Sequence, residues 1–204
     1  MREAWLNQTT FNSYEAFYRE FHLNVPECFN FAFDVVDAIA AEDPERRAMV
    51  WCDDQGGERV FTMSDIARAS NQAARAFATA GIRRGDAVML ILKRRYEYWF
   101  ALMGLCRLGA VAIPATNQLT QKDVVYRIRS AGVSMILCVN EPAIRAAVDA
   151  AVTEAPVRVR ALVNGGDDGT GWMDFNAACD QASPEPLEAA LCARDTGACD
   201  PMLL

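Results

Sequence analysis

The 204-residue chain is 52% hydrophobic and 23% charged, which is typical of a globular domain and excludes an intrinsically disordered one. Its 27 acidic and 20 basic residues give a net charge of −7, whereas nucleic-acid binders usually carry a basic stripe, so no nucleic-acid partner is expected. No stretch approaches the ~18 apolar residues of a membrane span, and the first residues lack the apolar core of a signal peptide, so we expect a soluble, cytoplasmic protein.

Aromatic residues are concentrated in the first segment of the chain, residues 1–29. They recur at helical spacing: Phe11, Tyr14, Phe17, Tyr18 and Phe21. This spacing predicts a short amphipathic helix whose rings cover a core rather than form a ligand cage. Residues 30–204 are expected to form an α/β domain.

The α/β domain is predicted to begin with a helix and a hairpin. Residues 31–41 indicate a helix with Asn30 as its N-cap, ending near Asp43–Pro44, because proline disfavours helix at the residue before it. Residues 48–53 and 59–62 have the composition of short strands. The sequence Asp-Gln-Gly-Gly between them favours a β-hairpin turn.

The next helix has a start signal and a stop signal. Thr62 is followed three residues later by Asp65, which is the acidic variant of a capping box. Gly81 marks its end. The side chains expected to be buried share one helical face: Ile66, Ala69, Ala73 and Phe77.

Strands and helices then alternate along the chain. Apolar runs predict strands at residues 87–92, 110–113, 134–139 and 157–163. The helices expected between them cover residues 96–108, 121–131 and 142–152, with Thr120 and Asp123 capping the second of these. Trp99, Leu102, Met103 and Cys106 are predicted to lie on the inner face of the first. This alternation predicts an α/β fold, a parallel sheet with helices on both faces.

The last part of the chain is less regular. Residues 164–171 indicate a flexible turn, residues 172–179 a short helix, and residues 181–200 a mostly polar loop. Residues 202–204, Met-Leu-Leu, resemble the first half of a strand.

Residue types that carry chemistry give no complete site. The loop Gly165–Gly171 follows a strand but lacks the Gly-Lys-Ser/Thr ending of a phosphate loop, and its Asp167 and Asp168 would repel phosphate. His22 is the only histidine, so base-activated serine chemistry has no base, and we interpret His22 as structural. We therefore predict no catalytic residue.

The cysteines also argue against a metal site. Seven occur, no two of them with Cys-x-x-Cys spacing, and several lie in apolar runs. This pattern is typical of buried free thiols in a reducing compartment, and we predict no structural zinc and no other metal site.

Short basic clusters remain at Arg83–Arg84 and Lys93–Arg95. A solvated loop or helix edge is the simpler interpretation of each. The alternative is a contact with an anionic group such as the phosphate of a nucleotide.

Several motifs in order resemble adenylate-forming enzymes. Residues 81–88 resemble the family's Gly-x-x-x-Gly-Asp-x-Val motif, residues 97–104 its following helix, and residues 108–114 its Gly-Ala-Val-x-x-Pro strand. Residues 62–71 are similar to its capped helix. Residues 114–118, 123–128 and 171–175 look like the medium-chain acyl-CoA synthetase group within this AMP-binding superfamily, and the resemblance covers residues 21–204.

This resemblance implies an AMP-forming acyl-CoA synthetase. Such enzymes join a carboxylic acid to AMP using ATP and magnesium, and CoA then displaces AMP. Their phosphate loop follows a stretch that Asp200–Leu204 resembles, so the resemblance implies an N-terminal part, with an incomplete AMP-binding domain over residues 30–204. We expect no catalysis and no tight cofactor binding from these residues alone.

Few site residues follow from the resemblance. Gln118 matches a glutamine that contacts CoA in the medium-chain group; a loop hydrogen bond is the alternative. Arg94 matches a family arginine and is a candidate cofactor contact.

Two other interpretations remain open at this point. The chain is alternatively a non-catalytic α/β module that docks with a second chain, in which case an unpaired sheet edge predicts self-association. It is otherwise an independent nucleotide-binding protein with the same layout, whose site would lie at the carboxyl ends of the strands.

Overall fold

A parallel sheet of five strands forms the centre of the protein. The structure is a computed structural model, and it describes residues 5–166 and 169–204. The strands are β3 (Ala87–Ile91), β4 (Val111–Pro114), β5 (Val133–Val139), β6 (Val159–Val163) and β7 (Met173–Asp174). They lie in the order β4-β3-β5-β6-β7, and every neighbouring pair is parallel. The predicted parallel sheet is confirmed.

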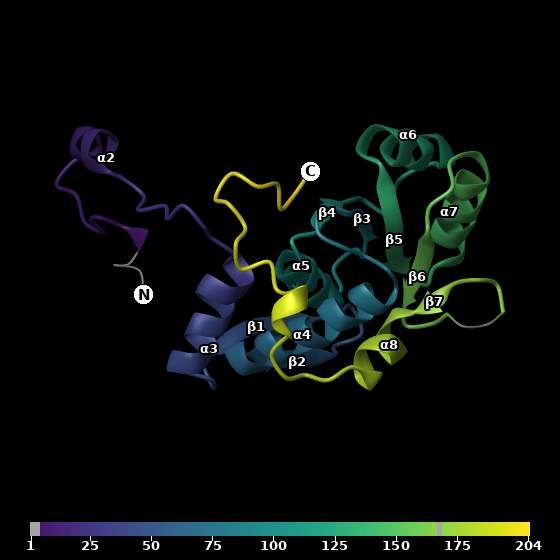
Figure 1. Ribbon diagram of the computed structural model, residues 1–204, viewed down its shortest axis with the longest axis horizontal. Helices are drawn as coiled ribbons and strands as arrows, with labels where there is room; N and C mark the ends of the chain where they lie inside the picture. The colour runs from purple at the N-terminus through teal and green to yellow at the C-terminus, as the bar shows by residue number, and fades with distance from the viewer. Residues whose placement is uncertain (1–4, 167–168) are drawn as a thin grey trace.

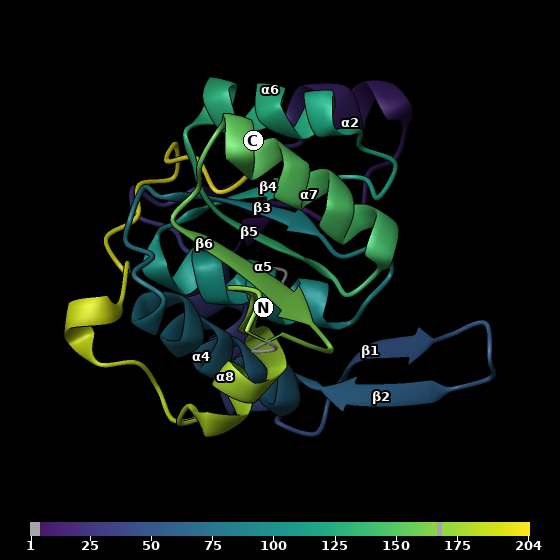
Figure 2. The same ribbon diagram turned by 90° about the vertical axis from the view of Figure 1, so that its right-hand side faces the viewer.

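Helices cover both faces of this sheet, as the alternation predicted. Figure 1 shows the course of the chain, and Figure 2 shows helices above and below the sheet. Helices α6 (Gln121–Ala131) and α7 (Pro142–Glu154) lie on one face. Helices α4 (Met63–Thr79), α5 (Glu97–Leu108) and α8 (Phe175–Gln181) lie on the other. Every residue of β3 is buried, as expected for a strand covered on both sides.

Local signals in the sequence set the ends of these helices. Thr62 and Asp65 form a complete capping box at α4, and Thr120 and Asp123 form another at α6. Glycines with left-handed φ angles end α5 and α6, at +66° and +60°. Left-handed backbone is unfavourable for a residue with a Cβ atom, which explains the choice of glycine there.

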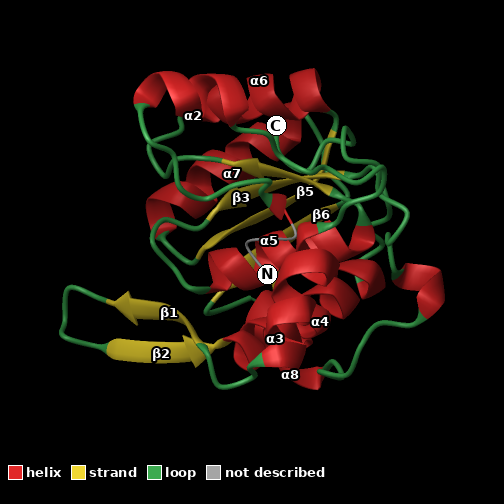
Figure 3. Cartoon of the chain, turned by 90° about the vertical axis from the view of Figure 1, so that its left-hand side faces the viewer, coloured by secondary structure: helices red, strands yellow, loops and turns green. Residues whose placement is uncertain are grey.

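A two-stranded hairpin stands beside the central sheet. Strands β1 (Arg47–Cys52) and β2 (Glu58–Thr62) pair antiparallel, as predicted, and Figure 3 shows them extending from the helical layer. In the turn, the Oδ1 atom of Asp53 accepts hydrogen bonds from the backbone N–H groups of Gln55 and Gly57. The Asp-Gln-Gly-Gly sequence therefore turns the chain as its residue types suggest.

The helix predicted at residues 31–41 is present but wider at its start. Residues Ala32–Asp37 form the π-helix η1, and α3 (Ala38–Glu42) continues it to Asp43. Asn30 acts as the cap, since its side-chain oxygen accepts the N–H of Ala32 at 3.1 Å.

Asn30 also joins distant parts of the chain. Its side chain is buried and donates to the carbonyl oxygens of Cys106 at 2.8 Å and Ala193 at 3.2 Å. Beside it, the N–H of Phe29 donates to the carbonyl of Thr196 at 2.9 Å. The start of the domain is thus fixed to α5 and to the last part of the chain.

Arg107 ties three helices together inside the protein. It is 1% exposed, and its guanidinium makes two hydrogen bonds to the carboxylate of Asp37, at 2.6 and 2.8 Å. It also donates to the hydroxyl of Ser70 at 2.9 Å and lies 5.2 Å from the ring centre of Phe33. Because each guanidinium nitrogen of this buried cation donates to an acceptor, the cluster stabilises the packing of η1, α4 and α5.

The aromatic side chains of the first segment do not cover the domain core. The predicted helix exists as α2 (Tyr14–Glu20), but Tyr14 and Tyr18 are 72% and 79% exposed. Phe11, Phe17 and Phe21 pack on one another instead. Figure 1 shows α2 set apart from the sheet, so the expectation that these rings cover a core is wrong.

Two further expectations need correction. Trp99, expected on the inner face of α5, is 49% exposed, because that helix is apolar on more sides than the sheet can cover. Residues 172–179 are not one helix: Met173 and Asp174 add the edge strand β7, and α8 begins at Phe175. The side chain of Asp174 caps this helix by accepting the N–H of Ala177.

The residues at positions 202–204 pair with β4, as their composition predicted. The N–H of Ala112 donates to the carbonyl of Met202 at 3.0 Å, and the N–H of Leu204 donates to the carbonyl of Ala112 at 3.1 Å. Leu203 and Ala112 form a parallel bridge. The sheet therefore extends past β4 on its outer side.

Candidate functional site

The carboxyl ends of three strands open into a cavity of about 400 Å³. We call it the edge pocket. Its wall comes from the hairpin and from the residues after β3, β5 and β6: Trp51, Cys52, Asp53, Asp54, Lys93, Arg94, Arg95, Val139, Asn140, Glu141, Val163 and Asn164. β4, the strand that follows β3 in sequence, lies on one side of β3, and β5, which comes next, lies on the other side. The strand order therefore reverses at β3. Ligands of open parallel sheets bind where this reversal occurs.

Unusual backbone geometry occurs at the rim of the edge pocket. Lys93 has a φ angle of +52° and Asn164 one of +60°. Among residues 5–166 and 169–204, no other non-glycine residue has positive φ. Residues held in this region of backbone space are concentrated at ligand-binding sites, where surrounding contacts maintain them.

The three basic residues after β3 differ in their partners. Lys93 pairs with Glu141 at 2.6 Å. Arg95 makes two hydrogen bonds to the buried carboxylate of Glu97, at 2.6 and 3.0 Å, and these bonds raise the pKa of Arg95 against the opposing effect of burial. Arg94 is exposed, and its guanidinium makes no ion pair with any residue that the structure describes. Arg94 is therefore the cation of this loop that remains available to an anion.

Gln118 lies on the other side of β3, in the exposed loop after β4. Its N–H donates to the hydroxyl of Thr116 at 3.3 Å. A second cavity of about 400 Å³ opens beside this loop, lined in part by Tyr98, Asn117 and Lys93. Lys93 lines both cavities, whereas Arg94 lines the edge pocket alone and Gln118 lines neither. The structure does not bring the two candidate residues into one cavity.

The residues that the sequence excluded from chemistry lie outside the edge pocket or outside the described residues. His22 is exposed, and its backbone N–H donates to the side chain of Asn7 at 3.0 Å. Asp167 and Asp168, in the glycine-rich loop, lie outside the described residues. Within the described ranges, no three His, Cys, Asp or Glu side chains are grouped to hold a metal ion, and no helix there is long and apolar enough to cross a bilayer.

The cysteines of the described chain are all free thiols. Burial raises the pKa of Cys138 and of Cys179 to about 12, so neither is a nucleophile at neutral pH. Cys52 is exposed in the wall of the edge pocket.

Sequence reasoning identified Gln118 only through the resemblance, and Arg94 through the resemblance and through the basic cluster at residues 93–95. It missed the contribution of the hairpin and of Asn164, which come from elements far from Arg94 in the chain. The Asn-Gly-Gly sequence after β6 was a signal for positive φ, because asparagine is enriched there. No local signal links it to the loop after β3.

Comparisons with known proteins identify the family of the chain. The family model described as AMP-binding enzyme matches residues 36–198. The human mitochondrial acyl-coenzyme A synthetase ACSM3 is 33% identical over 179 residues, which is 85% of this chain and 30% of that protein. The mitochondrial ACSM5 of Rattus norvegicus is 35% identical over 167 residues, covering 79% of this chain and 28% of that protein.

Solved structures show the same fold. An acyl-CoA synthetase of Brucella canis superposes with a TM-score of 0.69 at 25% identity, over 80% of this chain and 29% of that one. The anthranilate CoA ligase AuaEII, solved with anthranoyl-AMP, gives a TM-score of 0.69 at 18% identity, over 84% of this chain and 31% of that one. The chain spans about 30% of the length of these relatives. Since the family model covers most of its residues, the chain belongs to the family of AMP-binding enzymes, and it is similar within that family to acyl-CoA synthetases.

Proposed function

We propose that this chain is the N-terminal part of an AMP-forming acyl-CoA synthetase, an acid–thiol ligase. In the proposed reaction, a carboxylate oxygen attacks the α-phosphorus of ATP and pyrophosphate leaves. The thiol of CoA then attacks the acyl carbon of the acyl-adenylate, and AMP leaves. The observation that supports this most is the 33–35% identity to ACSM synthetases over about four fifths of the chain.

Within this proposal, the described residues supply a frame with two candidate contacts. Arg94 offers an unpaired guanidinium to an anionic group, and Gln118 offers an amide to CoA. Magnesium would accompany ATP. Because the described residues hold no cluster of acidic or imidazole ligands, we assign no step to the metal ion.

We further propose that residues 1–204 do not form acyl-adenylate alone. No Ser/Thr/Gly-rich phosphate loop occurs among them. The test is the carboxylate-dependent exchange of labelled pyrophosphate into ATP. It is run with the chain alone and with the chain mixed with a polypeptide that supplies the remaining part of an ACSM relative. We expect exchange only in the mixture, and none when the carboxylate is omitted. Exchange by the chain alone would contradict the proposal.

A second candidate function is a non-catalytic module that docks with another chain. The pairing of Leu203 at the outer side of β4 favours it, because a sheet edge with free backbone groups is a template for association. This alternative predicts dimers or larger species in light scattering, and a monomer at high concentration would contradict it.

The proposed location is the cytoplasm, although the similar ACSM proteins are named as mitochondrial. Cell fractionation with detection of this chain distinguishes the two compartments.

A further inference from the structure

The loop after β3 needs an explanation for its shape. Lys93 adopts a φ angle of +52°, and the loop closes with a hydrogen bond from the N–H of Arg95 to the carbonyl of Leu92 at 3.1 Å. A left-handed conformation costs roughly 1–2 kcal/mol for a residue with a Cβ atom. Other contacts must therefore hold this loop in place.

Those contacts come from the hairpin. The indole Nε1 of Trp51 donates a hydrogen bond to the carbonyl oxygen of Arg94 at 2.7 Å. The guanidinium of Arg95 lies 5.4 Å from the ring centre of Trp51 and 5.1 Å from that of Tyr96. One side chain of β1 thus contacts two consecutive residues of the loop.

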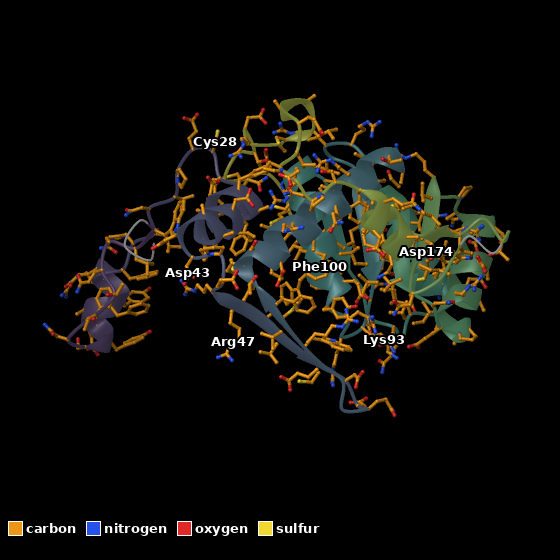
Figure 4. The ribbon with its side chains drawn as sticks, turned by 90° about the horizontal axis from the view of Figure 1, so that it is seen from below. Cys28, Asp43, Arg47, Lys93, Phe100 and Asp174 are labelled. Carbon is orange, nitrogen blue, oxygen red and sulfur yellow. The ribbon has the colours of Figure 1, made fainter. Side chains whose placement is uncertain are left out.

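The hairpin is itself fixed to the start of α5. Arg59 of β2 donates to the hydroxyl of Tyr96 at 2.9 Å and lies 5.0 Å from its ring centre. The ring of Phe61 packs against Tyr96 at 5.2 Å and against Phe100 at 5.4 Å. Figure 4 shows the hairpin that begins at Arg47 on the same side of the molecule as Phe100 and Lys93. The packing of β2 on Tyr96 and Phe100 therefore holds the hairpin, and with it Trp51, beside the loop.

We propose that Trp51 is a positioning residue: its indole N–H holds the backbone carbonyl of Arg94 and thereby fixes the position of Arg94 in the wall of the edge pocket. This inference rests on the proposed function for the role of Arg94 as an anion contact. Tryptophan suits the position because the carbonyl of Arg94 needs a donor and the indole N–H is a donor only. Phenylalanine would keep the ring beside Arg95 and lose the hydrogen bond.

The first measurement is the hydrogen exchange rate of the Arg95 amide, by NMR, in the 204-residue chain. Trp51→Phe is expected to raise this rate about fivefold, which corresponds to the roughly 1 kcal/mol of one hydrogen bond. Trp99→Phe is the matched control, because that half-exposed ring contacts Tyr98 and not the loop. An Arg95 amide that exchanges at the same rate in Trp51→Phe and in the unaltered chain would overturn the inference.

The second measurement separates this inference from the proposed function. Pyrophosphate is titrated into the unaltered chain, Arg94→Ala, Arg94→Lys and Trp51→Phe, with calorimetric detection. We expect Arg94→Ala to abolish binding, Arg94→Lys to retain part of it, and Trp51→Phe to weaken it about fivefold, since the guanidinium is less well placed. Equal affinities of Trp51→Phe and the unaltered chain, with loss in Arg94→Ala, would overturn the positioning role. Equal affinities, or no binding, in both the unaltered chain and Arg94→Ala would instead overturn the assignment of Arg94 as an anion contact.

Discussion

Two arginines at opposite ends of α5 have opposite environments. Arg107, in the last turn, is buried and contacts Asp37, Ser70 and the ring of Phe33. Arg94, just before the first turn, is exposed in the edge pocket and makes no ion pair within the described chain. A buried cation with every donor satisfied contributes to the fold, whereas an exposed cation without a partner is available for binding. The two are indistinguishable by residue type, and their surroundings alone assign the roles.

The largest contrast between the two ends should appear in thiol reactivity. Cys106 neighbours Arg107, and burial raises its pKa, while Cys52 is exposed in the edge pocket. We expect N-ethylmaleimide to label Cys52 more than about a thousandfold faster, because Cys106 reacts only after an opening that costs about 5 kcal/mol or more. Peptide mass spectrometry over time measures both rates. Comparable rates would show that the buried end opens easily.

Removal of each arginine should separate structure from binding. Arg107→Leu is expected to lower the free energy of unfolding by about 1–3 kcal/mol, since the hydroxyl of Ser70 and the partly exposed carboxylate of Asp37 lose their hydrogen-bond donor. Arg94→Ala is the matched control and should change that free energy by less than about 0.5 kcal/mol. Urea titrations followed by circular dichroism give both values. Equal losses in the two variants would remove the distinction drawn here.

Gly104, in the middle of α5, tests how tightly α5 packs against α4. A Cβ atom added at Gly104 would lie 2.9 Å from the Cβ of Ala73 and 2.9 Å from the backbone nitrogen of Ala74. Gly104→Ala should therefore cost about 1–3 kcal/mol, although alanine normally favours helix. Gly197→Ala, where the nearest atom would be 3.5 Å away, is the control for thermal denaturation. A more stable Gly104→Ala would mean that α4 and α5 separate readily.

Asp86 is intermediate between the buried Arg107 and the exposed Arg94, because its side chain is partly exposed and forms an ion pair with Arg158. Burial raises its pKa, but hydrogen bonds from Arg158, the Arg83 amide and Ser134 outweigh this and hold the pKa below its ordinary value. A lowered folded-state pKa gives stability that is present above the unfolded pKa and lost as the pH falls through the folded one. Asp86→Asn should thus cost roughly 1 kcal/mol at pH 7.

The pH dependence of this loss is the informative part. The difference between Asp86→Asn and the unaltered chain should begin to shrink as the pH falls below about 4, the ordinary pKa of an aspartate, and should vanish only below the lowered pKa of the folded state. Denaturant titrations at a series of pH values measure it. A loss that is the same at pH 7 and pH 3 would show that Asp86 acts through packing and not through its charge.

Much of the central fold was predictable because its signals are local. The capping boxes at Thr62 and Thr120 and the apolar runs of β3 and β5 each lie within a few residues. The errors occur where tertiary contacts decide: the exposure of Trp99, the two-residue strand β7, and the packing of the aromatic rings around α2. The parallel direction of the strands followed from the alternation, but the order of the strands and the position of the hairpin beside the sheet did not.

The candidate site was predictable only in part. The resemblance pointed to Arg94, which follows β3, and to Gln118, which follows β4. The wall of the edge pocket requires Trp51 and Asn164 to meet the loop after β3, at sequence separations of more than forty residues. No periodicity or motif in the chain encodes that meeting, because it depends on how Phe61 of the hairpin packs on Tyr96 and Phe100.

The hydrogen bonds of the Asn30 side chain cannot all form until most of the chain has been synthesised. The amide of Asn30 bonds with Ala193 across 163 residues of sequence. A ribosome that adds about 5–20 residues per second needs roughly ten to thirty seconds to make the intervening chain. Once α5 has been made, the side chain of Asn30 can donate to the carbonyl oxygen of Cys106, but Ala193 and Thr196 are still missing. The contact between the start of the domain and the last part of the chain is therefore among the last to form.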